Sequence, residues 1–433
     1  MAEWDKQEKE DFAFIKEKIK QKPVNKKRLF RQGMYTVGFA VLFGAVSCFV
    51  FVLLYPVVEE WLHPRQDPFI SIPEDEMGTE ELFGTEDIST EEKEAVLDPP
   101  EAELPPVVVK ELELADYQSL QNKIYAIGKE ANCSVVTVTG VVSDTDWYNN
   151  LYESNGQASG IIIGDNGSEL LVLTEHKLVM AATQIQVTFI DEITVNAALK
   201  KYDGNTGIAI LSVPLQSIGE DTKNRIDYAK LGNSLTVEQG NIAIAIGSPL
   251  GTNYSIGTGN ITSVGNVIQT ADATYTVFTT DIAGNSNSSG ALLNLNGEIV
   301  GLVMQDYNEN LDNNTLTAIS ISELKKIIEM LSNGRDIPYL GLKVLAVTEE
   351  IAKENDLAQG IYIKEVMLES PAFEAGLQSG DVIVKMGGEE IYTVPTYESK
   401  VLELEPEEPI EIVVSRQGMD EHLRLKVMAG RLW

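Results

Sequence analysis

Three serines lie close together in the segment "TTDIAGNSNSSGALLN", which runs from Thr279 to Asn294. A serine hydroxyl can attack a carbonyl carbon when a base lies within hydrogen-bond reach, an acid orients that base, and backbone N–H groups face the developing oxyanion. The glycines of the segment suit a tight turn, and the apolar run after the serines suits a barrel strand. The segment alone leaves Ser286, Ser288 and Ser289 as equal candidates for the nucleophile.

The sequence gives little support for other kinds of chemistry. The histidines share no metal-ligand spacing and the chain has no CxxC pair, so we expect no metal site. The glycine-rich "GTGN" is not followed by a strand–GxGxxG–helix unit, so we expect no nucleotide and no other cofactor. Cys48 lies in an apolar run and Cys133 in the main body of the chain, and we expect no disulfide between them. The three histidines are His63, His176 and His422.

The composition is that of an acidic globular protein. The chain has 433 residues, which is enough for two or three domains. It carries 66 acidic and 33 basic residues, with a formal net charge of −33. Because phosphate binding needs a basic surface, we expect no nucleic-acid partner.

The N-terminal region changes character twice. Residues 1–33 carry ten Lys or Arg, and residues 34–58 are 25 residues without a charge. Such a run is long enough to cross a bilayer core of about 30 Å. A cleaved signal peptide fits less well, because the basic region is long and the apolar run exceeds 15 residues. The sequence therefore predicts a single-pass cell-membrane protein with a cytoplasmic basic N-terminus over 1–33, a transmembrane helix over 34–58 and an extracytoplasmic remainder.

An acidic stretch follows, and then a region of short strands. Residues 59–115 are rich in acids and in Pro–Pro breaks, and we expect them to form a flexible linker. From about residue 116 short β-type runs alternate with Asn/Gly/Asp turns, which is typical of an antiparallel barrel or sandwich. The segment "SISELKKIIEMLSNG" predicts a helix closed by Gly334. The last hundred residues predict a smaller mixed α+β unit.

Four segments together resemble the HtrA/Deg-type serine proteases, from about residue 130 to residue 430. The resemblance implies a mainly β fold, with a chymotrypsin-like double β-barrel over residues 116–334 and a PDZ domain over 335–433, behind the transmembrane helix. The four segments are "NIAIAIGSPLGTNYSIGTGNITSVG", "TTDIAGNSNSSGALLNLNGEIVGLV", "YLGLKV" and "SPAFEAGLQSGDVIVKMGG".

The resemblance also assigns the triad positions. The family's G-N-S-G-G-P-L-L-N, aligned from "ALLN" backwards, puts Ser288 at the nucleophile and Ser289 at the glycine after it. The family's L-T-N-N-H-V-V reads "LTEHKLV", which without gaps puts Lys177 at the base and His176 one residue early. One residue turns a side chain by about 100° on a helix, or to the opposite face of a strand.

The acid position is the weakest part of the match. The family's T-D-L-A-V-L reads "TGIAIL", which puts Gly207 where an aspartate would orient the base. Asp203 lies four residues earlier, in a turn, and would have to reach back. Lys177 could serve as a base only if burial removed its proton near neutral pH. With two of three triad positions altered, we expect a catalytically impaired protease homologue; the alternative is an active serine endopeptidase that uses Ser288 and His176.

The remaining expectations concern binding. The backbone N–H groups of Leu340, Gly341 and Leu342 are expected to bind the C-terminal carboxylate of a peptide, which would add as a strand. The groove could instead be filled by its own chain or pack on the barrel as a structural cap. Expected partners are unfolded or C-terminal peptide segments of proteins, the membrane through one helix and, as the family implies, two further copies in a homo-trimer. A barrel that serves only to oligomerise is a third possibility.

Overall fold

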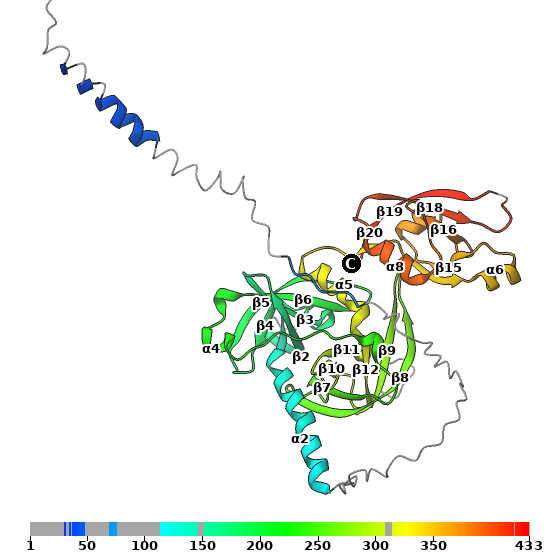
Figure 1. Cartoon of the computed structure of the whole chain (residues 1–433), viewed down its shortest axis with the longest axis horizontal. Helices are drawn as coiled ribbons and strands as arrows, with labels where there is room; N and C mark the ends of the chain where they lie inside the picture. Colours follow the sequence, from blue (N-terminus) through cyan, green and yellow to red (C-terminus); the bar gives the residue numbers. More distant parts are fainter. Residues whose placement is uncertain are drawn as a thin grey trace, which may run out of the picture. The chain divides into compact units, whose positions relative to one another are not determined.

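The computed structural model describes residues 30–31, 34–35, 37–47, 69–75, 113–145, 151–307, 314–419 and 421–432. It divides into two units, Met1–Asp67 and Pro68–Trp433 (Figure 1). The second unit contains two closed barrels and a C-terminal sheet.

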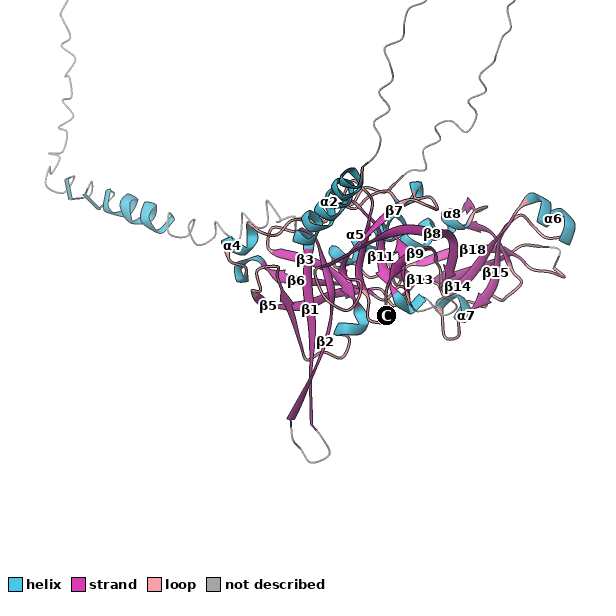
Figure 2. Cartoon of the chain, turned by 90° about the horizontal axis from the view of Figure 1, so that it is seen from below, coloured by secondary structure: helices cyan, strands magenta, loops and turns pink. Residues whose placement is uncertain are grey.

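The first barrel is built from β1 (Val135–Thr145), β2 (Leu151–Asp165), β3 (Glu169–Glu175), β4 (Gln184–Thr188), β5 (Thr194–Tyr202) and β6 (Ile208–Pro214). The strands pair antiparallel in the order β1-β2-β3-β6-β5-β4, and β4 closes the barrel on β1. The far ends of β1 and β2 extend away from the barrel as a paired ribbon (Figure 2). The short helix α3 (His176–Val179) lies between β3 and β4, and α4 (Glu220–Lys223) lies in the segment that leads from β6 to the second barrel.

The second barrel is built from β7 (Ile242–Ser248), β8 (Ser255–Gln269), β9 (Thr274–Ala283), β10 (Ser289–Leu293), β11 (Ile299–Met304) and β12 (Thr315–Ser320). Its order is β10-β11-β12-β9-β8-β7, and β7 closes the barrel on β10. Helix α2 (Leu114–Ala131) precedes the first barrel, and α5 (Ile321–Ser332) follows the second.

A shared apolar core joins the two barrels. In β3, Leu170 and Val172 belong to the core of the first barrel, whereas Leu171 and Leu173 belong to a core that also contains residues of β7, β10 and α5. Successive side chains of a strand point to opposite faces, so a strand buried on both faces reads as a continuous apolar run. The run "ELLVLT" is one of the short β-type runs of the sequence, and it forms β3 as predicted.

The C-terminal unit is a sheet with three helices. Its strands pair in the order β14-β15-β16-β18-β19, β17 pairs with β16, and β13 pairs with β20. The strands are β13 (Pro338–Tyr339), β14 (Leu342–Val347), β15 (Gly360–Val366), β16 (Val382–Met386), β17 (Glu389–Glu390), β18 (Pro409–Ser415), β19 (Leu423–Met428) and β20 (Gly430–Arg431). The helices are α6 (Glu349–Asn355), α7 (Pro371–Glu374) and α8 (Val394–Leu402).

Capping residues explain where these helices begin. The Ser370 hydroxyl accepts from the Phe373 N–H at 3.1 Å, and Pro371 follows at the first helical position, where its missing N–H removes no helical hydrogen bond. Thr393 caps α8 in the same way, through the N–H of Thr396.

The two barrels and the C-terminal sheet confirm, in the described residues, the mainly β architecture that the sequence predicts.

The predicted transmembrane helix over residues 34–58 is not confirmed. In the part of the chain that the structure describes, no helix is both long and apolar enough to cross a membrane. The prediction of a single-pass membrane location was wrong on this finding. Residues 1–29 and 48–58 lie outside the described residues.

Part of the expected linker is bound to the body of the second unit. Residues 69–75, which we call the strap, run along α5 in an extended conformation (Figure 1). The Ile70 N–H donates to the Asn333 side chain at 2.9 Å, and the Asn333 amide donates back to the Ile70 carbonyl at 2.7 Å. The Ile72 N–H donates to Glu329 at 2.7 Å. Side chains of α5 and of its C-cap thus satisfy backbone groups of the strap. Residues 76–112 of the expected linker lie outside the described residues.

A buried ion pair fixes the end of the strap. Lys325, whose side chain is 4% exposed, donates to both carboxylate oxygens of Asp75, at 2.8 and 2.7 Å. Ser322 donates to the same carboxylate at 2.5 Å. A buried ammonium needs such a partner, because it has lost its hydration.

We expect Asp75→Ala to lower the free energy of unfolding by roughly 3 kcal/mol, because Lys325 would remain buried without its counter-charge. The neighbouring pair Glu74–Lys326 is 3.3 Å apart with side chains 64% and 41% exposed, so the control Glu74→Ala should change it by less than about 0.5 kcal/mol. Urea unfolding of the full chain, followed by circular dichroism, measures both. Equal midpoints for the two variants would contradict the role given to the buried pair.

Candidate functional site

Ser288 lies at the end of the loop between β9 and β10 and is 1% exposed. Its hydroxyl donates to the Pro249 carbonyl at 2.5 Å and accepts from the Asn285 N–H at 2.7 Å. A hydroxyl has one proton to donate, and here that proton is held by a backbone carbonyl. In this arrangement the hydroxyl donates to no base.

The N–H groups of the same loop also point inward. The Ser288 N–H donates to the Asn285 carbonyl at 3.0 Å, and the Asn287 N–H donates to the Asn285 side chain at 2.8 Å. An oxyanion site needs free N–H groups that face the reacting carbonyl oxygen. These two donors are used within the loop instead.

The two neighbouring serine candidates lie in different settings. Ser286 is exposed, whereas Ser289 is 2% exposed and begins β10. The Ser289 hydroxyl accepts from the N–H of Ser159 in β2, at 2.9 Å. Its partner belongs to the other barrel, so Ser289 links the two barrels across their shared face.

His176 begins α3 and is held by its backbone and by its ring. Its N–H donates to the Gly207 carbonyl at 2.7 Å. Its imidazole stacks on Tyr202, with ring centroids 3.7 Å apart and 6° between the planes. Burial lowers the pKa of His176, which favours the neutral ring near pH 7. Neither hydrogen bond of the Ser288 hydroxyl goes to this ring.

Lys177 takes part in a charge cluster. Its ammonium lies 2.6 Å from Glu175 and 3.0 Å from Asp306, and the Glu175 side chain is 7% exposed. Partial burial lowers the pKa of Lys177, but the hydrogen bonds and charges of the two carboxylates outweigh it and raise the pKa overall. A lysine that keeps its proton cannot accept one from a serine.

The acid position carries a turn. Gly207 has a φ of +75°, and its N–H donates to the Asp203 carbonyl at 2.9 Å. The Asp203 carboxylate is fully buried and accepts from the Asn205 N–H at 3.0 Å and from the Thr206 hydroxyl at 2.5 Å. The carboxylate therefore caps its own turn, and these bonds do not run to the His176 ring.

The C-terminal unit presents the predicted row of N–H groups, and the row is occupied. The N–H groups of Leu340 and Gly341 donate to one carboxylate oxygen of Asp272, both at 2.7 Å, and that of Leu342 donates to the other at 3.0 Å. The Tyr397 hydroxyl donates to the same carboxylate at 2.6 Å. Sequence reasoning missed Asp272, which lies 68 positions before Leu340 in a turn that carries no motif.

A cavity of about 120 Å³ adjoins this contact, between the second barrel and the C-terminal unit. Glu323, Glu398 and Tyr275 line it beside Asp272. Burial raises the pKa of Glu398 to about 7, and hydrogen bonds from Thr274 oppose that shift. The cavity thus has an acidic lining whose charge changes near neutral pH.

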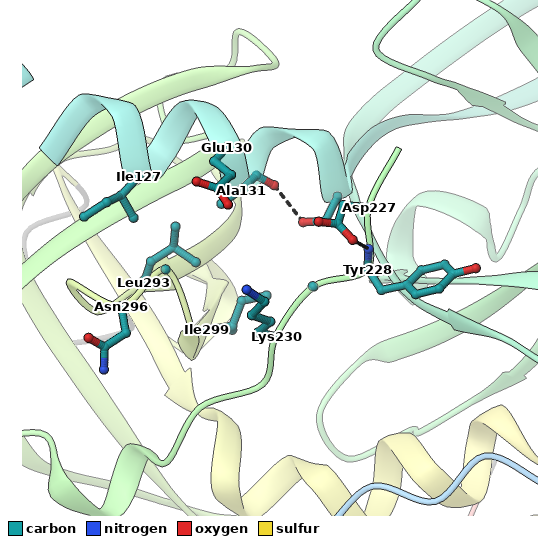
Figure 3. Close-up of a pocket in the computed structure, with 12 residues that line it drawn as sticks. Ile127, Glu130, Ala131, Asp227, Tyr228, Lys230, Leu293, Asn296 and Ile299 are labelled. Atoms are coloured by element: carbon teal, nitrogen blue, oxygen red, sulfur yellow. Dashed lines mark hydrogen bonds between the residues drawn. The ribbon is translucent and has the colours of Figure 1, made fainter. Parts of the chain in front are cut away.

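A second hollow, of about 80 Å³, lies between α2 and the second barrel. Figure 3 shows Glu130, Asp227 and Lys230 around it. The Asp227 carboxylate accepts from the Tyr228 N–H at 2.8 Å. None of the residues predicted for catalysis or peptide binding lines this hollow, so it gives no support to either function.

Comparisons with known proteins agree with this architecture. Residues 158–302 match the trypsin-like peptidase domain family, and residues 338–427 match the PDZ domain family. The Serine protease Do-like HtrA of Lactobacillus helveticus is 28% identical over 296 residues, which are 64% of this chain and 70% of the relative. A probable periplasmic serine endoprotease, DegP-like, of Pseudomonas putida strain W619 is 31% identical over 288 residues, which are 64% of this chain and 57% of the relative.

The solved structure of the HtrA-type protease AlgW with a tripeptide matches with a TM-score of 0.53 and 25% identity, over 71% of this chain and 96% of that one. The fold is therefore a trypsin-like double barrel followed by a PDZ domain, and the chain is similar to HtrA-type serine proteases. It spans 57–70% of the length of the two curated relatives given above.

The raised pKa of Glu398 predicts a pH dependence of stability. The folded protein holds this proton up to about pH 7, while the unfolded chain releases it near pH 4.5, so the free energy of unfolding should fall as pH rises between these values. Urea unfolding at pH 5 and pH 7.5 measures the difference in the free energy of unfolding between the two pH values. We expect this difference to be smaller by roughly 1–3 kcal/mol in Glu398→Gln than in the native chain. The exposed Glu421→Gln should leave it unchanged. A pH dependence that persists in Glu398→Gln would assign it to another group.

Proposed function

We propose that this chain is an HtrA-type protein that binds peptide segments of other proteins, in protein quality control or as an adaptor, and whose serine protease activity is lost or strongly impaired. The observation that carries the proposal is the hydrogen bonding of Ser288, whose hydroxyl proton goes to the Pro249 carbonyl. The similarity to HtrA-type proteases supports the family, and the altered triad positions support the loss of activity.

Three further observations support impairment. The ring of His176 is stacked on Tyr202, Lys177 is paired with carboxylates, and position 207 has no side chain. Loss of the orienting acid alone lowers kcat about 10⁴-fold in a serine protease, and loss of a complete triad about 10⁶-fold. Cleavage of an unfolded substrate by this chain should therefore be slower than that of an active relative by several orders of magnitude.

Peptide binding is proposed for the PDZ domain. Converging N–H groups of a PDZ loop recognise a carboxylate, and a neighbouring strand edge accepts an extended chain. Leu340, Gly341 and Leu342 supply such N–H groups. We propose domain limits of 116–334 for the barrels and 335–433 for the PDZ domain, and a homo-trimer as the assembly, which sedimentation of the full chain would test.

Labelling with a fluorophosphonate tests the loss of activity. This reagent reacts with a serine that a base activates, so we expect no labelling of the full chain at pH 7–8 and no cleavage of casein. An active HtrA-type protease, assayed in parallel, shows that the conditions are adequate. Labelling that Ser288→Ala abolishes and Ser286→Ala retains would overturn the proposal in favour of a serine endopeptidase. Ser286 is the matched control because it is the exposed serine of the same loop.

A further inference from the structure

The turn between β8 and β9 contacts the PDZ domain. β8 ends at Gln269 and β9 begins at Thr274, and both strands are labelled in Figure 1. The turn is closed by the Thr270 N–H, which donates to the Ala273 carbonyl at 2.9 Å. Within it, Asp272 has a φ of +61°, a left-handed conformation that costs about 1–2 kcal/mol in an L-residue and that aspartate tolerates better than most. Contacts outside the turn must therefore hold Asp272 in place.

Asp272 makes the contacts that the terminal residue of a bound peptide would make. Such a residue presents a carboxylate to the N–H groups of the loop and, as part of an added strand, hydrogen-bonds the strand beside it. The Asp272 carboxylate accepts hydrogen bonds from the N–H groups of Leu340, Gly341 and Leu342. In turn, the Asp272 N–H donates to the Leu342 carbonyl at 2.7 Å. The side-chain carboxylate of Asp272 thus occupies the site expected for the C-terminal carboxylate of a bound peptide.

Further contacts continue along the same strand edge. The Gln269 side chain donates to the carbonyl of Val344, two residues further along β14. Tyr397 of α8, which is fully buried, donates its hydroxyl to the Asp272 carboxylate oxygen that also accepts from the Leu342 N–H. The turn of the barrel therefore occupies the space between β14 and α8, where a peptide strand would lie.

The backbone of the binding loop is closely packed at Gly341. Gly341 has a φ of +87°, and a Cβ at this position would lie 2.3 Å from the Cβ of Ser370. Asp272 is 6% exposed, and its described partners are four N–H or O–H donors with no Lys or Arg among them. A buried carboxylate is destabilising unless such donors satisfy it. The buried carboxylate of Asp272 therefore needs the N–H groups of the loop as donors, and these N–H groups have the carboxylate as their acceptor.

We propose that the β8–β9 turn is a built-in ligand of the PDZ domain, with Asp272 in the carboxylate site, so that a foreign chain end binds only by displacing it. This inference rests on the proposed peptide binding at Leu340, Gly341 and Leu342 and names what controls access to that site. A tethered ligand acts at an effective concentration in the millimolar range, so it lowers the apparent affinity of a competing peptide by roughly 10- to 1000-fold.

Asp272→Asn tests the inference, because the amide keeps the size of the side chain but turns an NH₂ group toward N–H donors. The probe is a fluorescein-labelled pool of random decapeptides with a free C-terminal carboxylate, compared with the same pool amidated. We expect the substitution in the full chain to raise the affinity for the free-carboxylate pool at least tenfold, measured by fluorescence anisotropy, and to leave the amidated pool unbound. Tyr397→Phe, which removes one donor, should have the same effect to a smaller degree.

Asp281→Asn is the matched control, because this exposed aspartate of β9 accepts from Asn260 within its own barrel. Hydrogen exchange of the amides of residues 340–342 gives a readout that needs no peptide. Exchange should be slow in the native chain and in Asp281→Asn, and at least tenfold faster in Asp272→Asn.

The two readouts separate the inference from the function it rests on. Faster exchange in Asp272→Asn without peptide binding would support the built-in ligand and count against peptide binding. Binding of the free-carboxylate pool that is equally tight in native chain and Asp272→Asn would support peptide binding and overturn the built-in ligand. Unchanged exchange at residues 340–342 in a folded Asp272→Asn chain would also overturn it.

Discussion

The burial of both faces of the strands between the two barrels is the constraint on which the rest of the structure depends. Leu171 and Leu173 of β3, together with alternate residues of β7 and β10, fill one common core, and their neighbours fill the interior of each barrel. Because side chains alternate along a strand, a slip of one residue would exchange the two sets. The register is therefore fixed, and so are the ends of these strands. The loop of Ser288 ends where β10 begins, and His176 directly follows the last residue of β3.

The polar groups at that place are hydrogen-bonded or ion-paired within the fold. Catalytic groups are kept reactive by unmet hydrogen bonds or by perturbed pKa values directed at the substrate. The N–H groups of the Ser288 loop and the carboxylate of Asp203 have partners within their own turns, whereas the Ser288 hydroxyl donates to the carbonyl of Pro249, just after β7. Lys177 finds two carboxylates. These contacts satisfy polar groups of the fold, and they are the basis of the proposed loss of activity.

The sequence predicts those features that depend on neighbouring residues, and misses those that join distant ones. The continuous apolar run of β3 and the Ser-Pro pair at residue 370 are local features of the sequence, and β3 and the start of α7 follow from them. The contact of Lys177 with Asp306 spans 129 residues, and that of Asp272 with Leu340 spans 68. Neither pair has a spacing that marks it. A local feature also led to a wrong prediction: the composition of the apolar run after residue 33 predicted a membrane span, which the described structure does not confirm.

The contact of the strap with α5 makes the effect of a backbone cut predictable. Residues 69–75 are bound to α5, and residues 76–112 connect them to the part of the chain that begins with α2. A single backbone cut between residues 76 and 112 would leave two polypeptides in contact through the Asp75–Lys325 pair and the hydrogen bonds of Ile70 and Ile72. Occupancy of that contact would then depend on protein concentration, whereas in the intact chain it does not. Integrity of this connection therefore decides whether dilution can separate the N-terminal part of the protein from the barrels.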